Sequence, residues 1–340
     1  MPPSMVWYQA TKNTEGICLS TKEQVLAALA EAEEAVSGER LARKLGLSRN
    51  AVWKAVDQLR REGYAIEAVT NRGYMLSAEV RPVTEAGIRA HLDQPLLGGS
   101  IEVYDEIDST NRRAKAWAAM GAPDGAVVCA RRQSNGRGRF TRPFHSPMNG
   151  GAYFTVILRP KQPADRAVML TSMAAVAVAR AVERMTGVEA KIKWVNDVYL
   201  NGRKVCGILS EAGLDFETGT LEYAAVGIGI NTARQEFPED IRDIATSMGN
   251  ETGVDPDPSA VIAQVLNEMA GLLPQLGDGG FMREYRARSN VLGRRVTVLR
   301  GDERFPAVAV DIDAEGSLIV QTENGPEKLR SGEISIRMGE

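Results

Sequence analysis

The chain has 340 residues, of which 44% are hydrophobic and 25% are charged, a composition typical of a globular protein with two or three domains. A formal net charge of −3 argues against a strongly cationic coat protein for nucleic acids, while it leaves room for local basic surfaces. Three widely spaced cysteines and only two histidines disfavour a disulfide framework, a fixed metal site of the zinc type and a histidine-based catalytic triad.

The start of the chain lacks the basic-then-apolar order of a signal peptide, and no apolar run approaches the length of a membrane span. We therefore expect an N-terminal tail at residues 1–20, a cytoplasmic location and no membrane partner.

Residues 21–80 show the order helix, helix, helix, hairpin, which predicts a winged helix-turn-helix domain. The helices are expected at residues 22–34, 39–45 and 49–62, with Ser48 as the N-cap of the third, and the wing strands at residues 64–69 and 74–76. Three polar side chains of the third helix are expected to enter the major groove of DNA: Arg49, Asn50 and Lys54. Acidic residues roughly balance basic ones here, so the alternative is a winged helix kept for protein contacts.

After a break at residues 79–82, helices alternate with strands, which predicts an α/β (α+β) domain with a mixed sheet at residues 81–288. Its strands are expected at residues 101–104, 126–130, 151–158, 191–200, 203–211 and 222–230, and its helices at residues 84–92, 109–120, 165–186, 261–273 and 281–290. The last part of the chain, residues 289–340, changes to short strands separated by turn residues. Four strands are expected there, at residues 296–299, 307–312, 318–321 and 334–337, forming a small SH3-like β-barrel.

The stretch Gln133-Ser-Asn-Gly-Arg-Gly-Arg-Phe-Thr-Arg142 follows a buried strand and alternates two glycines with arginines. Such a backbone can turn sharply and approach a ligand, while its amides and guanidinium groups are suited to anions. The alternative is a solvated basic loop or a nucleic-acid patch.

A hairpin is predicted at residues 191–211, because Asn201-Gly202 favours a two-residue type I′ turn. That turn would pair Leu200 with Arg203, Tyr199 with Lys204 and Asp197 with Cys206. Lys204 and Asp197 would then project from one face as diagonal neighbours, beside Gly207. They form a candidate catalytic pair, and the alternative is a surface salt bridge.

Two further features are candidates for ligand contact. Ser109-Thr110-Asn111 opens a helix and could either cap it or bind the polar head of a ligand. Gly227 and Gly229 lie inside an expected strand, where glycine often marks the close approach of a ligand or of backbone.

Four blocks together carry a specific resemblance, although each alone is a weak signal. They are Ser109-Thr110-Asn111, Gly136-Arg-Gly-Arg139, Lys193-Trp-Val-Asn-Asp197 and Arg203-Lys-Val-Cys-Gly-Ile-Leu209. In their order and spacing the chain resembles a biotin protein ligase of the longer bacterial kind that also acts as a transcriptional repressor. The resemblance covers nearly the whole chain after about residue 21.

The resemblance implies that biotin and ATP, with Mg²⁺, give biotinyl-5′-AMP and pyrophosphate, and that the biotinyl group then passes to a lysine of a biotin carboxyl carrier protein. It implies biotin contacts at Ser109, Thr110, Asn111, Gln133, Gly136, Arg137, Gly138, Arg139, Lys204 and Gly207. It implies ATP contacts at Lys193, Asn196, Asp197, Gly229, Asn231, Arg142 and Phe144. The catalytic residues would be Lys204, Arg137, Arg139 and Asp197.

The residue types suit this chemistry, because cations must neutralise the charge that grows when ATP activates a carboxylate. A Walker phosphate loop is absent from the sequence. The chain departs from the family at Thr141, where the loop usually has glycine, and at Phe144, where tryptophan is usual. We expect altered adenylate retention but not lost activity.

The expected partners are the carrier protein, a DNA operator and a second copy of the chain, with dimers forming through sheet edges when the adenylate is bound. One alternative is lipoate or octanoyl transfer on a related fold. Another is a ligand-sensing repressor without catalysis.

Overall fold

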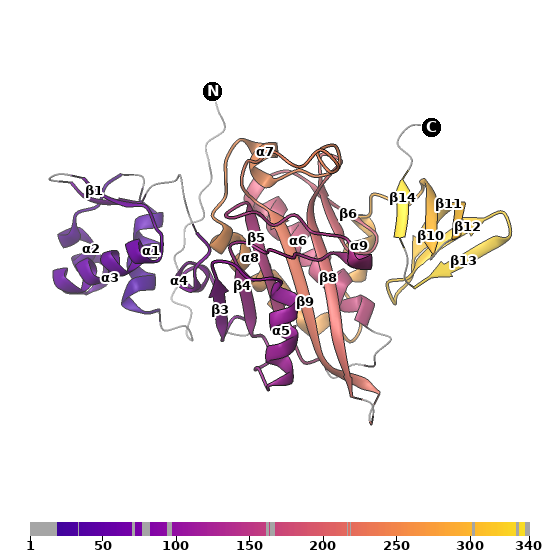
Figure 1. The fold of residues 1–340 in the computed structure, drawn as a ribbon, viewed down its shortest axis with the longest axis horizontal. Helices are drawn as coiled ribbons and strands as arrows, with labels where there is room; N and C mark the ends of the chain where they lie inside the picture. The colour runs from indigo at the N-terminus through magenta and orange to yellow at the C-terminus, as the bar shows by residue number, and fades with distance from the viewer. Residues whose placement is uncertain are drawn as a thin grey trace.

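The computed structural model describes residues 19–32, 34–69, 72–76, 82–93, 97–160, 163, 167–215, 217, 219–300, 303–330 and 333–336. The expected tail up to residue 18 and most of the break at residues 79–82 lie outside this part of the chain. Figure 1 shows three units in a row, with the N-terminal helices at one end, a large sheet in the middle and the C-terminal strands at the other end.

The N-terminal unit is a winged helix-turn-helix, as predicted. It contains α1 (Thr21–Ala30), α2 (Gly38–Leu45), α3 (Arg49–Arg61), β1 (Ile66–Val69) and β2 (Gly73–Leu76). Serines begin all three helices, and Ser48 caps α3 by accepting a hydrogen bond from the amide of Ala51 at 3.1 Å. Helix α1 ends at Ala30 and not at residue 34.

The middle unit contains a mixed sheet of seven strands in the order β3-β4-β5-β9-β8-β7-β6, in which only β3 and β4 are parallel. The strands are β3 (Ile101–Tyr104), β4 (Val127–Ala130), β5 (Gly151–Leu158), β6 (Ala190–Lys193), β7 (Asp197–Leu200), β8 (Arg203–Asp215) and β9 (Thr220–Asn231). Its helices are α4 (Glu85–Arg89), α5 (Thr110–Ala119), α6 (Ala167–Thr186), α7 (Met248–Thr252), α8 (Pro258–Leu272) and α9 (Met282–Ala287).

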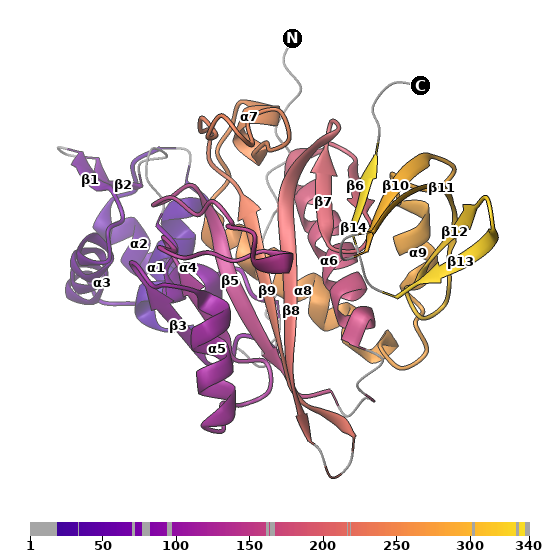
Figure 2. The same cartoon turned by 45° about the vertical axis from the view of Figure 1, so that its right-hand side comes forward.

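The two faces of this sheet are covered differently, because residues alternate between faces along each strand. Val127 and Val156 pack in the large core together with α6 and α8, whereas Val128 and Ile157 pack against Ala114 of α5. Figure 2 accordingly shows α5 in front of the sheet and α6 and α8 behind it.

Two expectations for the hairpin region were wrong. Residues 191–200 form two antiparallel strands, β6 and β7, with a turn between them. Asp197 lies opposite Gly207 and not Cys206, because Val205 is the extra residue of a bulge in β8. The turn itself is as predicted, since Asn201 and Gly202 both have positive φ, as a type I′ turn requires.

The C-terminal unit is all-β, as predicted, and forms one antiparallel sheet in the order β13-β12-β11-β10-β14. Its strands are β10 (Arg295–Arg300), β11 (Glu303–Ile312), β12 (Leu318–Thr322), β13 (Gly325–Leu329) and β14 (Glu333–Ile336). Strand β13 was not predicted. Within the described residues, β13 and β14 are the outer strands of this sheet and do not pair with each other.

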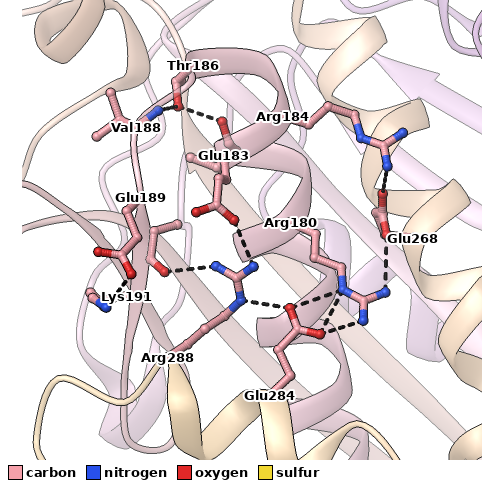
Figure 3. A network of polar contacts seen from close by, with 12 residues as sticks. Arg180, Glu183, Arg184, Thr186, Val188, Glu189, Lys191, Glu268, Glu284 and Arg288 are labelled. Carbon is pink, nitrogen blue, oxygen red and sulfur yellow. Dashed lines mark hydrogen bonds and ion pairs between the residues drawn. The ribbon is translucent and has the colours of Figure 1, made fainter.

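The Lys193–Asp197 block, which joins β6 to β7, is hydrogen-bonded to the C-terminal unit and to α9. Trp194 donates its indole hydrogen to the carbonyl of Gly316 at 3.0 Å, and Tyr285 donates to the carbonyl of Val195 at 3.0 Å. Glu284 of α9 accepts hydrogen bonds from Arg180 and from Arg288, and Arg288 also donates to Glu183 (Figure 3). The turn between β6 and β7 is thus hydrogen-bonded both to the C-terminal unit and to α9.

The winged helix is joined to helices α4 and α8 of the middle unit by buried polar contacts. The hydroxyls of Tyr64 and Thr84 lie 2.5 Å apart, and the Thr84 amide donates to Ser259 at 3.2 Å. Burial raises the pKa of the Tyr64 hydroxyl. None of the helices in the described part of the chain is long and apolar enough to cross a membrane.

Candidate active site

A cavity of about 110 Å³ lies where the glycine-arginine loop crosses the glycine-rich part of β8 and β9. It is lined by Ser109, Thr110, Asn111, Gln133, Arg137, Gly138, Arg139, Phe140, Arg142, Phe144, Lys193, Trp194, Asn196, Asp197, Lys204, Gly207, Ile208, Leu209, Gly227, Ile228 and Gly229. All four sequence blocks therefore meet around one space, as expected from their proposed common role.

Two of the expected site residues do not line the cavity but support its wall. Gly136 is buried, and its carbonyl accepts a hydrogen bond from the Phe144 amide at 2.9 Å. Asn231 is also buried, and its side chain donates to the carbonyl of Thr246 at 3.0 Å. Six further residues line the cavity without being among the ligand contacts that the resemblance implied: Phe140, Trp194, Ile208, Leu209, Gly227 and Ile228.

One end of the cavity is polar and is formed by the start of α5. Ser109 occupies the N-cap position without making a side-chain capping bond, and it is one of the residues that line the cavity. The Thr110 amide donates to Gln133 Oε1 at 2.9 Å, and Gln133 Nε2 donates to Ser146 at 3.1 Å. Simple capping therefore does not account for the Ser-Thr-Asn block.

The glycines of β8 and β9 make room for larger side chains above the sheet. Gly207 and Gly229 are strand partners, and a Cβ at Gly229 would lie 2.4 Å from Cε1 of the Phe144 ring. A Cβ at Gly227 would lie 1.9 Å from Oδ1 of Asn111. A close approach occurs at both glycines of β9, but the approaching groups are the side chains of Asn111 and Phe144, and not the ligand or backbone that the sequence led us to expect.

The loop folds back toward the hairpin through Arg139. Its guanidinium donates to Asn196 Oδ1 at 3.4 Å and lies 5.0 Å from the centre of the Phe140 ring. Phe140 has a φ of 54° and is 60% exposed, an unusual conformation for a bulky residue. Phe140 is thus the residue with a positive φ in the stretch 133–142. It directly precedes Thr141, where the family loop usually has glycine.

Lys204 and Asp197 form an ion pair at the other end of the cavity, with 2.7 Å between Nζ and Oδ1. The backbone of Lys204 is fixed on both sides, since its amide donates to Ile244 at 2.7 Å and its carbonyl accepts from Thr246 at 2.8 Å. Asp197 Oδ1 is buried and accepts no well-aligned hydrogen bond in the described part of the chain. The pair therefore attracts through charge and leaves the carboxylate able to accept further contacts.

Charge in the lining is strongly unbalanced. Its cations are Arg137, Arg139, Arg142, Lys193 and Lys204, whereas Asp197 is the one acidic side chain among the described lining residues. A cavity of this kind is suited to ligands with several negative charges. Among the described residues there is no cluster of three or more His, Cys, Asp or Glu side chains that could hold a metal ion by itself.

The three expected DNA contacts lie on the exposed face of α3: Arg49, Asn50 and Lys54. Trp53, beside them, is 55% exposed. Arg60, further along α3, contacts the wing: its Nε donates to the carbonyl of Ile66, and its guanidinium lies over the Tyr74 ring.

Family models match all three units of the chain. The Biotin/lipoate A/B protein ligase family matches residues 103–231, an HTH domain matches residues 21–75, and a Biotin protein ligase C terminal domain matches residues 291–337. Together with the cationic cavity, these matches define the class: a protein ligase of the biotin type that carries a helix-turn-helix domain.

Individual relatives agree with this class over nearly the full length. The chain is 36% identical over 310 residues to the bifunctional ligase/repressor BirA of Bacillus subtilis, with 89% of this chain and 94% of that protein covered. It is 30% identical over 319 residues to BirA of Escherichia coli, with 93% and 97% covered. A solved biotin protein ligase from Aquifex aeolicus, in complex with biotin and ATP, matches with a TM-score of 0.61 and 32% identity, covering 71% of this chain and 99% of that one.

The chain therefore belongs to the biotin protein ligase family, in the branch of the bifunctional ligase/repressors. The prediction of a biotin ligase with a repressor-type domain is confirmed, and the relatives do not favour the lipoate or the non-catalytic alternative.

Proposed function

We propose that this chain joins biotin to AMP at the expense of ATP and then transfers the biotinyl group to one lysine of a biotin carboxyl carrier protein. This proposal rests on one observation, the division of the cavity into two ends. The end at α5 is polar, and the other end is cationic and is formed by the loop at residues 136–142 and the β7–β8 hairpin. A biotin-like molecule has an uncharged polar ring at one end and a carboxylate at the other, which matches this division.

In this proposal the ring lies at the polar end, near Ser109, Thr110 and Gln133. The carboxylate and the α-phosphate meet near Lys204, Arg137 and Arg139. A carboxylate oxygen attacks the α-phosphorus, the bond to the β-phosphate oxygen breaks, and pyrophosphate leaves. Fixed cations stabilise the charge that develops during this step, and they need no nucleophilic side chain.

The second step uses the resulting mixed anhydride. A neutral lysine amine of the carrier attacks the acyl carbon, the bond from that carbon to the phosphate oxygen breaks, and AMP leaves. The amine proton passes to solvent or to a nearby base. Residues of the loop at 136–142 line the cavity, and a loop ordered over the anhydride would limit the access of water to it.

Mg²⁺ would accompany ATP, and Asp197 is the residue that fits it best. A hard cation prefers oxygen ligands, and Asp197 Oδ1 is buried beside Lys204 with no well-aligned hydrogen bond. Since one carboxylate is a weak site by itself, the phosphate oxygens of ATP would supply most of the remaining ligands. The ion would supply further neutralisation of phosphate charge.

The proposed activity is tested by biotin-dependent exchange of labelled pyrophosphate into ATP by the purified chain. Exchange that requires biotin supports the proposal. Exchange with lipoate but not with biotin, or no exchange with either acid, would overturn it. Transfer is followed separately, as biotin label appearing on a carrier domain.

We also propose that the chain represses transcription as a dimer. In this proposal residues 21–80 bind DNA, residues 81–288 form the catalytic domain and residues 289–340 form the C-terminal domain. The exposed polar face of α3 supports the first role. Strand β8 supports dimerisation, since β7 pairs with it only as far as Gly207 and leaves the edge of its second half without a partner strand among the described residues.

A gel-shift assay tests the coupling between ligand and DNA. The expected target is an operator with two half-sites, upstream of genes for biotin synthesis. Biotin with ATP is expected to tighten binding. Equal DNA binding with and without the two substrates would show that ligand binding and DNA binding are not coupled. That result would not contradict the proposed ligase activity.

A further inference from the structure

Thr155 lies directly beneath the polar end of the cavity without lining it. It belongs to β5, its side chain is fully buried, and its hydroxyl oxygen lies 2.8 Å from Thr110 Oγ1 and 2.7 Å from Asn111 Oδ1. A hydroxyl has only one hydrogen to donate, so it can serve only one of these two neighbours as a donor. Which neighbour receives the hydrogen decides what Thr110 offers to a ligand.

The direction of this chain of hydrogen bonds is set by Asn111. Its Nδ2 donates to the carbonyl of Leu209 and to the carboxylate of Glu211, each at 3.0 Å, and both of these groups can only accept. The amide oxygen of Asn111 must therefore be the atom that faces Thr155. Since that oxygen also only accepts, the Thr155 hydroxyl must be its donor.

Glu211 stays charged and keeps its place in this arrangement. Burial alone would raise its carboxyl pKa, but the hydrogen bonds from Lys115 and Asn111 outweigh burial and lower the pKa. An ionised carboxylate cannot donate, so the orientation of the Asn111 amide holds at neutral pH.

With its one hydrogen given to Asn111, Thr155 can only accept from Thr110. The Thr110 hydroxyl has another acceptor nearby, Gln133 Oε1, but that contact is longer, at 3.2 Å, and the Thr110 amide already serves the same oxygen at 2.9 Å. If the Thr110 hydrogen pointed at Gln133, two hydroxyl oxygens 2.8 Å apart would share no hydrogen. The shorter contact therefore takes it.

We propose that Thr155 is a positioning residue that turns the Thr110 hydroxyl into a hydrogen-bond acceptor toward the cavity, and so selects ligand rings that present an N–H group there. The cyclic urea of biotin presents such groups. This inference rests on the proposed function, because it assigns a source of selectivity to the same biotin site.

The packing around Thr155 holds the Asn111 amide in this one orientation. Gly227 is the strand partner of Thr155, and Asn111 packs so closely over it that a Cβ there would lie 1.9 Å from the amide oxygen. Asn111 is therefore held between Gly227, Thr155 and Glu211, and a rotation of its amide would break both of its donor bonds at once.

The test compares Thr155→Val with Thr155→Ser in the full chain. Valine keeps the shape and removes the hydroxyl, whereas serine keeps the hydroxyl. Calorimetric titration with biotin alone is expected to show affinity about tenfold or more weaker for Thr155→Val, because the buried hydroxyl that accepts from Thr110 and orients it is lost. Thr155→Ser is expected to stay within about threefold of the parent, and the KM for ATP is expected to be unchanged in both.

A cyclic carbamate analogue of biotin, in which a ring oxygen replaces the N–H nearer Thr110, separates positioning from general damage. The parent should prefer biotin over this analogue, and Thr155→Val should lose most of that preference. If Thr155→Val binds biotin as the parent does, or keeps the full preference, the inference is wrong. If Thr155→Val does not fold, Thr110→Val replaces it, and undiminished preference in that variant overturns the inference equally. Failure of the parent itself to bind biotin would instead contradict the proposed function.

Discussion

The ammonium group of Lys204 lies 2.7 Å from the carboxylate of Asp197 across the β7–β8 hairpin, at the cationic end of the cavity. Both side chains are mostly buried, with 28% of the lysine and 19% of the aspartate side chain exposed. In the proposed mechanism the carboxylate holds the ammonium in place until an anionic substrate arrives. We therefore propose that the charge of Lys204 assists the activation step.

Removal of that charge should therefore lower the rate of activation. Lys204→Met is expected to reduce biotin-dependent pyrophosphate exchange by about 10²-fold or more, the usual effect of losing one group that stabilises transition-state charge. Lys204→Arg should retain more activity than Lys204→Met. Steady-state exchange kinetics measure this, and a Lys204→Met protein with parental kcat would show that the pair is only a surface salt bridge.

The glycine at position 229 should not tolerate a side chain. In Gly229→Ala the new Cβ would lie 2.4 Å from the Phe144 ring, which would have to swing into the cavity. We expect raised KM values for both substrates with little loss of stability. Gly271→Ala is the matched control: this glycine is in α8 with nothing near it, and alanine there should stabilise the fold by about 0.5–1 kcal/mol. Parental KM values in Gly229→Ala would contradict the placement of Phe144.

The order of the helices and strands could be predicted because it depends on local patterns in the sequence. Serine caps, helical spacing and the Asn201-Gly202 turn each depend on a few neighbouring residues. The four blocks could likewise be recognised from their order along the chain, and the cavity they were expected to share is present.

What could not be predicted depends on contacts between distant segments. No glycine or proline marks the turn between β6 and β7, which is held by the bonds from Trp194 to Gly316 and from Tyr285 to Val195. Strand β13 contains Gly325 and Pro326, which are unfavourable in strands, and it is tolerated at the edge of its sheet. The position of Thr155 under the cavity likewise follows from sheet register and from the placement of α5.

Glu251 should stabilise the hairpin that carries Lys204. Its side chain is only 7% exposed and accepts hydrogen bonds from Asn201, Arg203 and Thr246. Glu251→Gln is expected to lower the free energy of unfolding by about 1–2 kcal/mol, the usual cost of weakening a hydrogen-bonded charge. Glu239→Gln, at an exposed ion pair, is the control and should change it by less than about 0.5 kcal/mol. Chemical denaturation measures both.

The stabilisation from Glu251 should depend on pH in a defined direction. Burial would raise the pKa of this carboxyl, but the hydrogen bonds from Thr246 and Asn201 and the charge of Arg203 lower it below the usual 4.5. Because the folded pKa is the lower one, the stabilisation is complete above pH 4.5 and is lost as the pH falls through the folded value. Unfolding curves of the parent and Glu251→Gln should therefore converge in acid. A constant difference between pH 7 and pH 3 would contradict this assignment.

Arg131 directly follows β4 and lies two residues before Gln133, where the glycine-arginine stretch begins. Its guanidinium donates to the carbonyls of Val83 and Glu62, each at 3.0 Å, and pairs with Asp105 at 2.7 Å. Glu62 is the C-cap of α3, so one side chain joins α3 to the segment that carries Gln133.

Arg131→Met should loosen the winged helix from the catalytic unit and leave ligase chemistry intact, because Arg131 does not line the cavity. Calorimetry is expected to show the N-terminal unit melting at a lower temperature than the rest, with pyrophosphate exchange unchanged. Arg132→Met is the matched control, since its neighbour Arg132 pairs with Glu106 in an exposed contact of 3.3 Å and reaches no other unit among the contacts described. In a gel shift, biotin with ATP should strengthen DNA binding less in Arg131→Met than in the control. Identical melting curves and identical ligand effects in the two variants would show that Arg131 does not couple the two units.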